Sequence, residues 1–255
     1  MVTFNISTAA ALLAAGAGVR IAKHGNRSFT SLCGSADVLE ALGVSIEVPV
    51  SVMERALRDA GIVFMFAPLM HPAMRHVGPV RRELAIPTVM NIVGPLANPA
   101  FAGRQVVGVA DERRVPLIAG ALRELGTMHT LVVHGAPGLD EVSPIGPTHV
   151  IEIRDGALRE WTIEPARYGF HDSRPEHLAG GSPKENAEMV RAVLGGEGSS
   201  GATAAVVLNA AAAIYVSGTV TTFDDAVGVA QSAVDNGAGL GALEKLQLAF
   251  TATGA

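Results

Sequence analysis

Two segments near the start of the chain combine residue types that bind phosphate groups. Residues 23–31 read Lys-His-Gly-Asn-Arg-Ser-Phe-Thr-Ser and supply two cations, several neutral hydrogen-bond donors and a glycine that allows close backbone approach. Residues 5–8 read Asn-Ile-Ser-Thr at the expected start of a helix, where free backbone N–H groups and the helix dipole favour an anion. The pattern indicates a phosphate site, although a capped helix followed by a solvated loop has the same composition.

An acidic pair and a basic pair lie further along the chain. Asp140 and Glu141 fall in an expected loop after a strand, and their hard oxygen ligands suit Mg²⁺, which commonly bridges to substrate phosphates. Arg81 and Arg82 could hold a carboxylate through paired hydrogen bonds. Taken alone, each pair is more often a solvated turn or a helix end.

Other kinds of chemistry are excluded by the histidines, the cysteine and the charges. The eight histidines show no His-Glu-x-x-His spacing, and no Gly-x-Ser-x-Gly elbow occurs, which argues against zinc and serine hydrolases. The single Cys33 excludes internal disulfides and multi-cysteine metal centres and fits a reducing cytoplasm. With 19 basic and 24 acidic residues the net charge is −5, so neither nucleic acid nor an anionic membrane is an expected partner. The start has no signal-peptide pattern, and no apolar run reaches the roughly 18–20 residues of a spanning helix.

The hydropathy pattern predicts the elements that must hold these residues. Hydrophobic residues make up 49% of the chain but aromatic residues only 4%, so we expect closely packed layers built from Ala, Val, Leu and Ile. Expected strands cover residues 19–22, 62–66, 105–109, 130–133, 150–153 and 160–163. Expected helices cover residues 9–15, 36–42, 49–60, 71–84, 116–125, 183–194, 202–216, 223–236 and 240–250, with Ser7, Thr8 and Ser35 as N-caps.

The order of these elements predicts an α/β fold. The strand–helix–strand pattern over residues 105–133 indicates parallel pairing with a right-handed crossover, and Asp155-Gly156 indicates a hairpin. We expect a central, mostly parallel sheet flanked by helices, with a helical C-terminal layer from Ser182 onward, in one domain spanning residues 1–255. Ligands of such sheets bind at the carboxyl ends of the strands, where the polar loops fall.

A series of short motifs also runs along almost the whole chain. They are Asn5-Ile-Ser-Thr, Lys23-His-Gly-Asn-Arg, Gly34-Ser-Ala-Asp-Val-Leu-Glu-Ala-Leu-Gly, His71-Pro-Ala-Met-Arg, Val80-Arg-Arg, Asn91-Ile-Val-Gly-Pro-Leu-Ala-Asn-Pro, His134-Gly-Ala-Pro-Gly-Leu-Asp-Glu and Asn209-Ala-Ala-Ala. In order and spacing the chain resembles the anthranilate phosphoribosyltransferases.

This resemblance implies a reaction and a fold. The amine of anthranilate displaces diphosphate from C1 of 5-phosphoribosyl diphosphate (PRPP), giving N-(5-phosphoribosyl)anthranilate for tryptophan biosynthesis. The implied cofactor is Mg²⁺, the implied location is the cytoplasm, and a homodimer is possible. The implied fold is the large α/β domain shared with nucleoside phosphorylases and related phosphoribosyltransferases.

The resemblance also implies which residues form the site, and it names no general base. For Mg²⁺ they are Ser7, Asp140 and Glu141. For anthranilate they are His24, Asn26 and Arg81. For PRPP they are Thr3, Asn5, Ile6, Ser7, Thr8, Lys23, His24, Gly25, Asn26, Arg27, Ser28, Phe29, Thr30, Ser31 and Ser35.

The sequence departs from the family pattern in three places. A Gly-Thr-Gly-Gly-Asp-Gly loop and a small helical domain precede the position of Thr3 in the family, so we expect this chain to correspond to the large catalytic domain. Thr30-Ser-Leu-Cys33 replaces a more serine-rich stretch, and Pro87 stands where arginine is usual. Two alternatives stay open, a ligand-binding remnant with little transfer activity and a related transferase or phosphorylase for a nucleobase. The combination of Asn26, Arg81 and His24 favours anthranilate.

Overall fold

The computed structural model describes residues 2–28, 32–73, 76–77, 83–84, 88, 93–94 and 96–251. The helices are α1 (Ile6–Gly16), α2 (Ser35–Ala41), α3 (Val50–Asp59), α4 (Ala67–Met70), α7 (Val115–Glu124), α8 (Pro183–Leu194), α9 (Ser200–Ser217), α10 (Phe223–Asp235) and α11 (Ala238–Thr251). The strands are β1 (Ile21–Gly25), β2 (Ile62–Phe66), β3 (Arg104–Gly108), β4 (His129–Gly135), β5 (Thr148–Arg154) and β6 (Ala157–Ile163).

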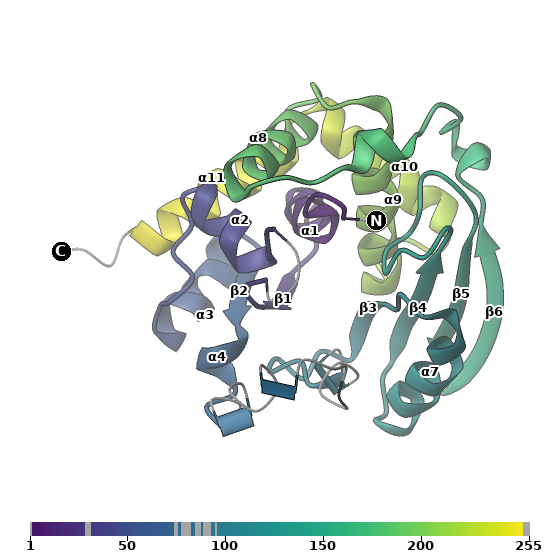
Figure 1. The fold of residues 1–255 in the computed structure, drawn as a ribbon, viewed down its shortest axis with the longest axis horizontal. Coiled ribbons are helices and arrows are strands. Elements are labelled where there is room, and N and C mark those ends of the chain that lie inside the picture. Colours follow the sequence, from purple (N-terminus) through teal and green to yellow (C-terminus); the bar gives the residue numbers. More distant parts are fainter. Residues whose placement is uncertain are drawn as a thin grey trace.

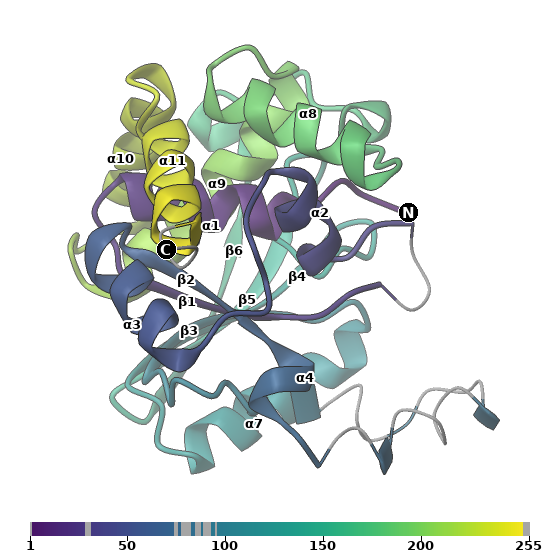
Figure 2. The same ribbon diagram turned by 90° about the vertical axis from the view of Figure 1, so that its left-hand side faces the viewer.

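The strands form two sheets between layers of helices. In one sheet β1 and β2 pair in parallel, with Lys23 opposite Phe64. The other has the order β3-β4-β5-β6, in which β3 and β4 are parallel and the remaining pairs are antiparallel. Helices α1 and α8–α11 cover one side of the strands, and α4 and α7 lie on the opposite side (Figures 1 and 2).

This arrangement confirms the α/β class with flanking helices and refines the sheet. The parallel pair joined through α7 and the hairpin at Asp155 are as expected from the sequence. The expectation of one central, mostly parallel sheet is corrected in detail, because the described strands divide into two sheets and half of the pairings are antiparallel. The division arises where β1 and β3 lie across a cavity from each other instead of pairing.

The centre of the helical layer is α9, which packs along α1 and α10. Nearly all of its side chains are buried, and most are Ala, Val, Ile or Leu, which lets the neighbouring helices approach closely. α9 is long and apolar enough to cross a membrane, but 78% of it is buried inside the molecule, as expected for a core helix. Asn209 is a polar exception on its buried face.

Several predicted boundaries are wrong for identifiable reasons. Helix α1 begins at Ile6 with Asn5 at its N-cap position, so Ser7 and Thr8 lie inside the first turn instead of capping it. Likewise Ser35 is the first residue of α2, and Gly34 occupies the N-cap position.

Two further boundaries differ near the cavity. Residues 23–25, expected as loop, continue β1 because their backbone pairs with the fully buried strand β2. The helix expected at 71–84 does not begin at His71, which follows the end of α4, and much of that range lies outside the described residues. By contrast, β2 and α8 have the predicted bounds.

Candidate functional site

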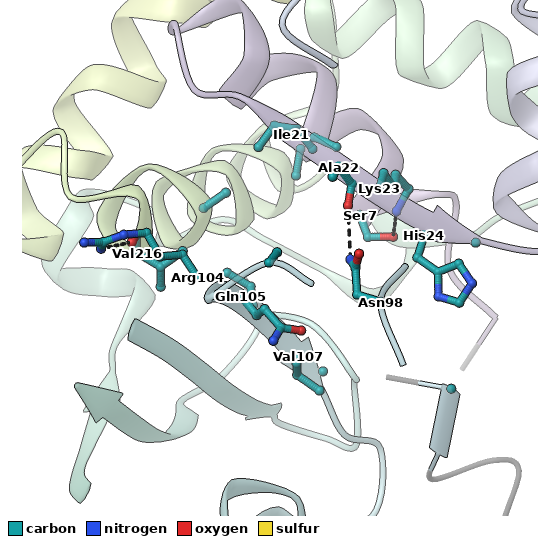
Figure 3. Close-up of a pocket in the computed structure, with 18 of the residues that line it drawn as sticks. Ser7, Ile21, Ala22, Lys23, His24, Asn98, Arg104, Gln105, Val107 and Val216 are labelled. Carbon is teal, nitrogen blue, oxygen red and sulfur yellow. Dashed lines mark hydrogen bonds between the residues drawn. The ribbon is translucent and has the colours of Figure 1, made fainter. Parts of the chain in front are cut away.

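A cavity of about 1180 Å³ lies between β1 of the first sheet and β3 of the second (Figure 3). Both strands contribute to its wall, together with residues of α1, α4, α9 and the loop that follows β4. The carboxyl ends of parallel strands meet here, which is where open α/β folds bind ligands.

The cavity brings together much of the set expected from the sequence. The described candidates that line it are Ser7, Lys23, His24, Gly25, Asn26, Asp140 and Glu141. The described candidates that do not line it are Thr3, Asn5, Ile6, Thr8, Arg27, Ser28 and Ser35. Phe29, Thr30, Ser31 and Arg81 lie outside the described residues.

Lys23 is the cation that β1 presents to the cavity. Its Nζ donates a hydrogen bond of 3.2 Å to Ser7 Oγ in the first turn of α1 (Figure 3). Burial lowers the pKa of Lys23 to about 8, and the charge of Glu141 partly opposes that shift. A partly desolvated ammonium group gains more from an anionic ligand than an exposed one does.

The acidic pair forms the opposite wall. Burial, together with the charge and hydrogen bond of Asp140, raises the pKa of Glu141 to about 8, while Lys23 acts against the shift. Glu141 Oε2 is buried and has no hydrogen-bond partner within the described part of the chain. A carboxylate that is destabilised in this way is suited to a cation.

The donor set fits Mg²⁺ supplied together with a phosphate ligand. The described residues contain no cluster of three His, Cys, Asp or Glu side chains, so the protein alone offers few ligands. Two carboxylates and the Ser7 hydroxyl are hard oxygen donors, and Mg²⁺ typically takes its remaining ligands from water and substrate phosphates.

Backbone packing fixes the loop that carries the acids. A Cβ atom at Gly108, the last residue of β3, would lie only 1.5 Å from the carbonyl oxygen of Asp140. At Gly135, at the end of β4, a Cβ would lie 2.4 Å from the carbonyl oxygen of Glu141. Two strands therefore end in glycine so that this loop can lie directly on them.

Two histidines form the part of the cavity beyond Lys23. The rings of His24 and His71 meet edge to face with centroids 5.0 Å apart. Burial, His71 and Lys23 all lower the pKa of His24, which favours the neutral ring. In each ring Nε2 is buried and has no hydrogen-bond partner among the described residues. His71 belongs to a recognised motif but was not predicted as a site residue.

Arg27 is held by α2 and does not line the cavity. Its guanidinium hydrogen-bonds Glu40 at 2.5 and 2.9 Å and Asp37 at 3.1 Å. Asp37 also accepts hydrogen bonds from the backbone N–H groups of Ser28 and Gly34, at 3.1 and 2.8 Å. Although burial acts in the opposite direction, these bonds and Arg27 lower the pKa of Asp37. Asp37 therefore ties Ser28 and Gly34 to the first turn of α2 and to Arg27.

The residues around the start of α1 are bound mainly to the protein itself. Thr3 forms a β-bridge with Ala179. Asn5 Oδ1 accepts a hydrogen bond of 3.0 Å from Asn186, and Asn5 Nδ2 donates to the carbonyl of Cys33 at 3.4 Å. Ile6 and Thr8 are buried. This segment forms the frame on which Ser7 reaches the cavity.

The cavity wall also contains polar residues that sequence reasoning did not assign. Asn98 donates a hydrogen bond of 3.2 Å to the carbonyl of Ala22 in β1, and Arg104 donates one of 2.7 Å to the carbonyl of Val216 (Figure 3). Asn209 reaches the cavity from α9. Asn98 and Asn209 lie in two of the motifs listed above, so the sequence did contain a signal for them. Arg104 and Gln105 lie in none of these motifs.

Comparison with known proteins assigns this arrangement to a family. The profile described as "Glycosyl transferase family, a/b domain" matches residues 1–240. The anthranilate phosphoribosyltransferase of Rubrobacter xylanophilus is 50% identical over 243 residues, which are 95% of this chain and 71% of that protein. The chain belongs to the anthranilate phosphoribosyltransferase family.

Solved structures agree with this assignment. The anthranilate phosphoribosyltransferase of Thermus thermophilus has a TM-score of 0.92 and 40% identity, covering 98% of this chain and 74% of that one. The Saccharomyces cerevisiae enzyme in complex with PRPP and Mg has a TM-score of 0.87 and 31% identity, and the match covers 98% of this chain and 70% of the yeast chain. The yeast enzyme in complex with 4-fluoroanthranilate has a TM-score of 0.86 and 30% identity, and the match covers 99% of this chain and 70% of the yeast chain. The α/β fold of this chain is therefore the fold of anthranilate phosphoribosyltransferases.

Proposed function

We propose that this chain transfers the phosphoribosyl group of PRPP to anthranilate, releasing diphosphate. The observation that carries the proposal is the convergence of Ser7, Lys23, Asp140 and Glu141 in one cavity at the carboxyl ends of β1 and β3. Family membership and the yeast complexes with PRPP and Mg and with 4-fluoroanthranilate support it.

Asp140, Glu141 and Ser7 are the residues that would hold Mg²⁺. When bound, the ion neutralises charge on the departing diphosphate and so stabilises it as a leaving group. The orphaned Glu141 Oε2 and the raised pKa of that carboxyl support a cation at this position. The Lys23 ammonium binds the same ligand from the opposite wall and holds its own proton when an anion is present.

Around the diphosphate, the frame residues position the rest of PRPP. Asp37 binds the backbone N–H groups of Ser28 and Gly34, and the first turn of α1 carries Ser7 to the cavity, so these elements hold the cavity-lining residues in place. The candidates that do not line the cavity, among them Asn5 and Arg27, act through this frame.

Anthranilate occupies the part of the cavity next to His24, Asn26 and His71. The lone pair of its amine forms a bond to C1 of the ribose while the C1–oxygen bond breaks, and the bonding electrons leave with diphosphate. The proton of the resulting ammonium passes to solvent. An aromatic amine is nucleophilic when it is held in line with C1, so positioning suffices and no general base is assigned. Arg81 is the proposed partner of the anthranilate carboxylate.

The loss of anthranilate fluorescence tests this function directly. We expect the purified chain to consume anthranilate only when PRPP and Mg²⁺ are both present. A folded chain that leaves the fluorescence unchanged would favour a ligand-binding role. Turnover of a nucleobase with PRPP, but not of anthranilate, would favour the related transferase. We also propose a cytoplasmic location, which the single cysteine of the chain supports because it excludes an internal disulfide.

A further inference from the structure

Asn209 holds the backbone of the acidic loop from the middle of helix α9. Its Oδ1 accepts a hydrogen bond of 2.9 Å from the N–H of Val142, and its Nδ2 donates one of 2.8 Å to the carbonyl of the same residue. Nδ2 also donates to the carbonyl of Ala205, one turn earlier in α9, at 2.9 Å. A single side chain thus binds both backbone groups of the residue that follows Glu141.

The setting makes this side chain difficult to explain by packing alone. Asn209 is 8% exposed and lies on a helix whose other buried positions are mostly Ala, Val, Ile and Leu. A buried amide destabilises an apolar core unless each of its polar atoms is paired. All of the pairing here is either to the acidic loop or to the helix itself, and an apolar residue would fill the same space without requiring the loop.

The loop is held from its other sides as well. The hydroxyl of Thr148 in β5 accepts a hydrogen bond of 2.9 Å from the N–H of Ser143. Gly108 and Gly135 allow Asp140 and Glu141 to lie against the ends of β3 and β4. Together with the hydrogen bonds of Asn209, these contacts hold the loop against β3, β4, β5 and α9.

We propose that Asn209 is a positioning residue that sets the Asp140 and Glu141 carboxylates for the cation and diphosphate; this rests on the proposed function. Asn209 acts through Val142 and is not itself a ligand. Groups that orient metal ligands typically change metal affinity by about 10–100-fold when they are removed. A residue that only stabilises the core would change folding and leave metal affinity alone.

The test uses the full chain and Mn²⁺ as the probe ion. We would titrate Mn²⁺ in the presence of diphosphate, follow free Mn²⁺ by electron paramagnetic resonance, and measure hydrogen exchange at the Val142 amide without metal. Asn209→Ala and Asn209→Leu remove the two hydrogen bonds between the Asn209 side chain and the Val142 backbone, which we call the clamp. The leucine variant keeps most of the side-chain volume. Tyr215→Phe is the matched control, because Tyr215 is also on α9, is also 8% exposed and loses one buried bond of 2.9 Å, to Glu152.

The expected result separates the clamp from general stability. Both Asn209 variants should bind Mn²⁺ about 10-fold or more weakly and exchange the Val142 amide about 10-fold or more rapidly, while Tyr215→Phe stays within about 2-fold of wild type. Unchanged Mn²⁺ affinity despite faster exchange would overturn the proposal. An equal loss of affinity in Tyr215→Phe would also overturn it.

A double variant keeps this test distinct from that of the proposed function. Asp140→Asn with Glu141→Gln should abolish Mn²⁺ binding in the same assay, and unchanged binding would overturn the metal site and the clamp together. If wild type binds Mn²⁺ with diphosphate but does not consume anthranilate, the proposed transfer fails. The Mn²⁺ and exchange results for Asn209 still decide the clamp in that case.

Discussion

At the scale of single residues, the structure separates charged side chains that line the cavity from charged side chains that are bound by other residues of the protein. Lys23 and Glu141 face the cavity, and the burial of both shifts their pKa values to about 8. Arg27 looks equally cationic in the sequence, yet its guanidinium is bound by two carboxylates of α2. The number of charged residues in a motif therefore does not show which of them are left to bind a ligand.

Asp37 gives a prediction about acid stability. Its pKa is lowered in the folded state, so the unfolded chain binds more protons at low pH, and the stability that Asp37 contributes is lost as pH falls below the ordinary range of an aspartate. We expect Asp37→Asn to lower the free energy of unfolding at pH 7 by about 1–2 kcal/mol and to flatten the acid limb of a stability–pH curve.

Chemical denaturation at several pH values measures this effect. Glu40→Gln is the control, because the Glu40 side chain is 43% exposed and its pair with Arg27 should contribute less than about 1 kcal/mol. Equal losses in the two variants would contradict the role of Asp37 in holding the backbone of Ser28 and Gly34.

Arg81 gives a prediction about substrate selection. If its guanidinium binds the anthranilate carboxylate, Arg81→Ala should raise the KM for anthranilate by about 10-fold or more and change that for PRPP much less, since a charged hydrogen bond contributes about 1.5–3 kcal/mol. Steady-state kinetics with each substrate varied in turn measures both. Equal increases in the two KM values would remove Arg81 from the anthranilate site.

At the scale of elements, glycines at the ends of strands decide where the acidic loop lies. Gly108→Ala places a Cβ against the carbonyl of Asp140, so we expect a loss of about 2–3 kcal/mol in unfolding free energy and a weaker response to Mg²⁺. Gly120→Ala in α7 is the control, because nothing lies within 4 Å of its added Cβ and alanine favours a helix by about 0.5–1 kcal/mol. A Gly108 variant with normal stability and normal Mg²⁺ response would show that the loop moves freely.

Local sequence patterns predicted elements well where they carried their own signals. The turn at Asp155-Gly156 between β5 and β6 and the start of a helix after Ser182 are local signals, and the structure contains both the hairpin and α8. The predicted boundaries were wrong where a residue far away in the sequence determines the local structure. Residues 23–25 are polar and read as loop, but pairing with buried β2 makes them strand. Asn5 occupies the N-cap position of α1 without a side-chain cap, because its side chain is bound to Asn186, far along the chain. The local sequence does not show this contact.

At the scale of the whole molecule, the cavity exists because the strands divide into two sheets. Its wall is formed by β1, β3, the loop after β4 and helix α9, which are spread over residues 21–217 of the sequence. The resemblance to the family implied that Ser7, Lys23, Asp140 and Glu141 belong to one site, and all four line the cavity. Motif spacing could not predict the contribution of Asn98 or Arg104, since their roles depend on carbonyl groups of Ala22 and Val216 across the fold.

The chain has a net charge of −5, so the binding of an anion must depend on a few local groups and not on the overall charge. In the proposed function, an anionic substrate is attracted by Lys23 and by a cation held by Asp140 and Glu141, and not by a basic surface. Cation and substrate should therefore bind together, because each supplies ligands or charge that the other needs.

Anomalous diffraction from a crystal of this chain grown with PRPP and Mn²⁺ tests that central claim most directly. We predict one Mn²⁺ peak in the cavity, coordinated by Asp140 and Glu141 and by the diphosphate, whose oxygens also contact Lys23. A Mn²⁺ peak away from both carboxylates, or a diphosphate bound outside the cavity between β1 and β3, would contradict the account.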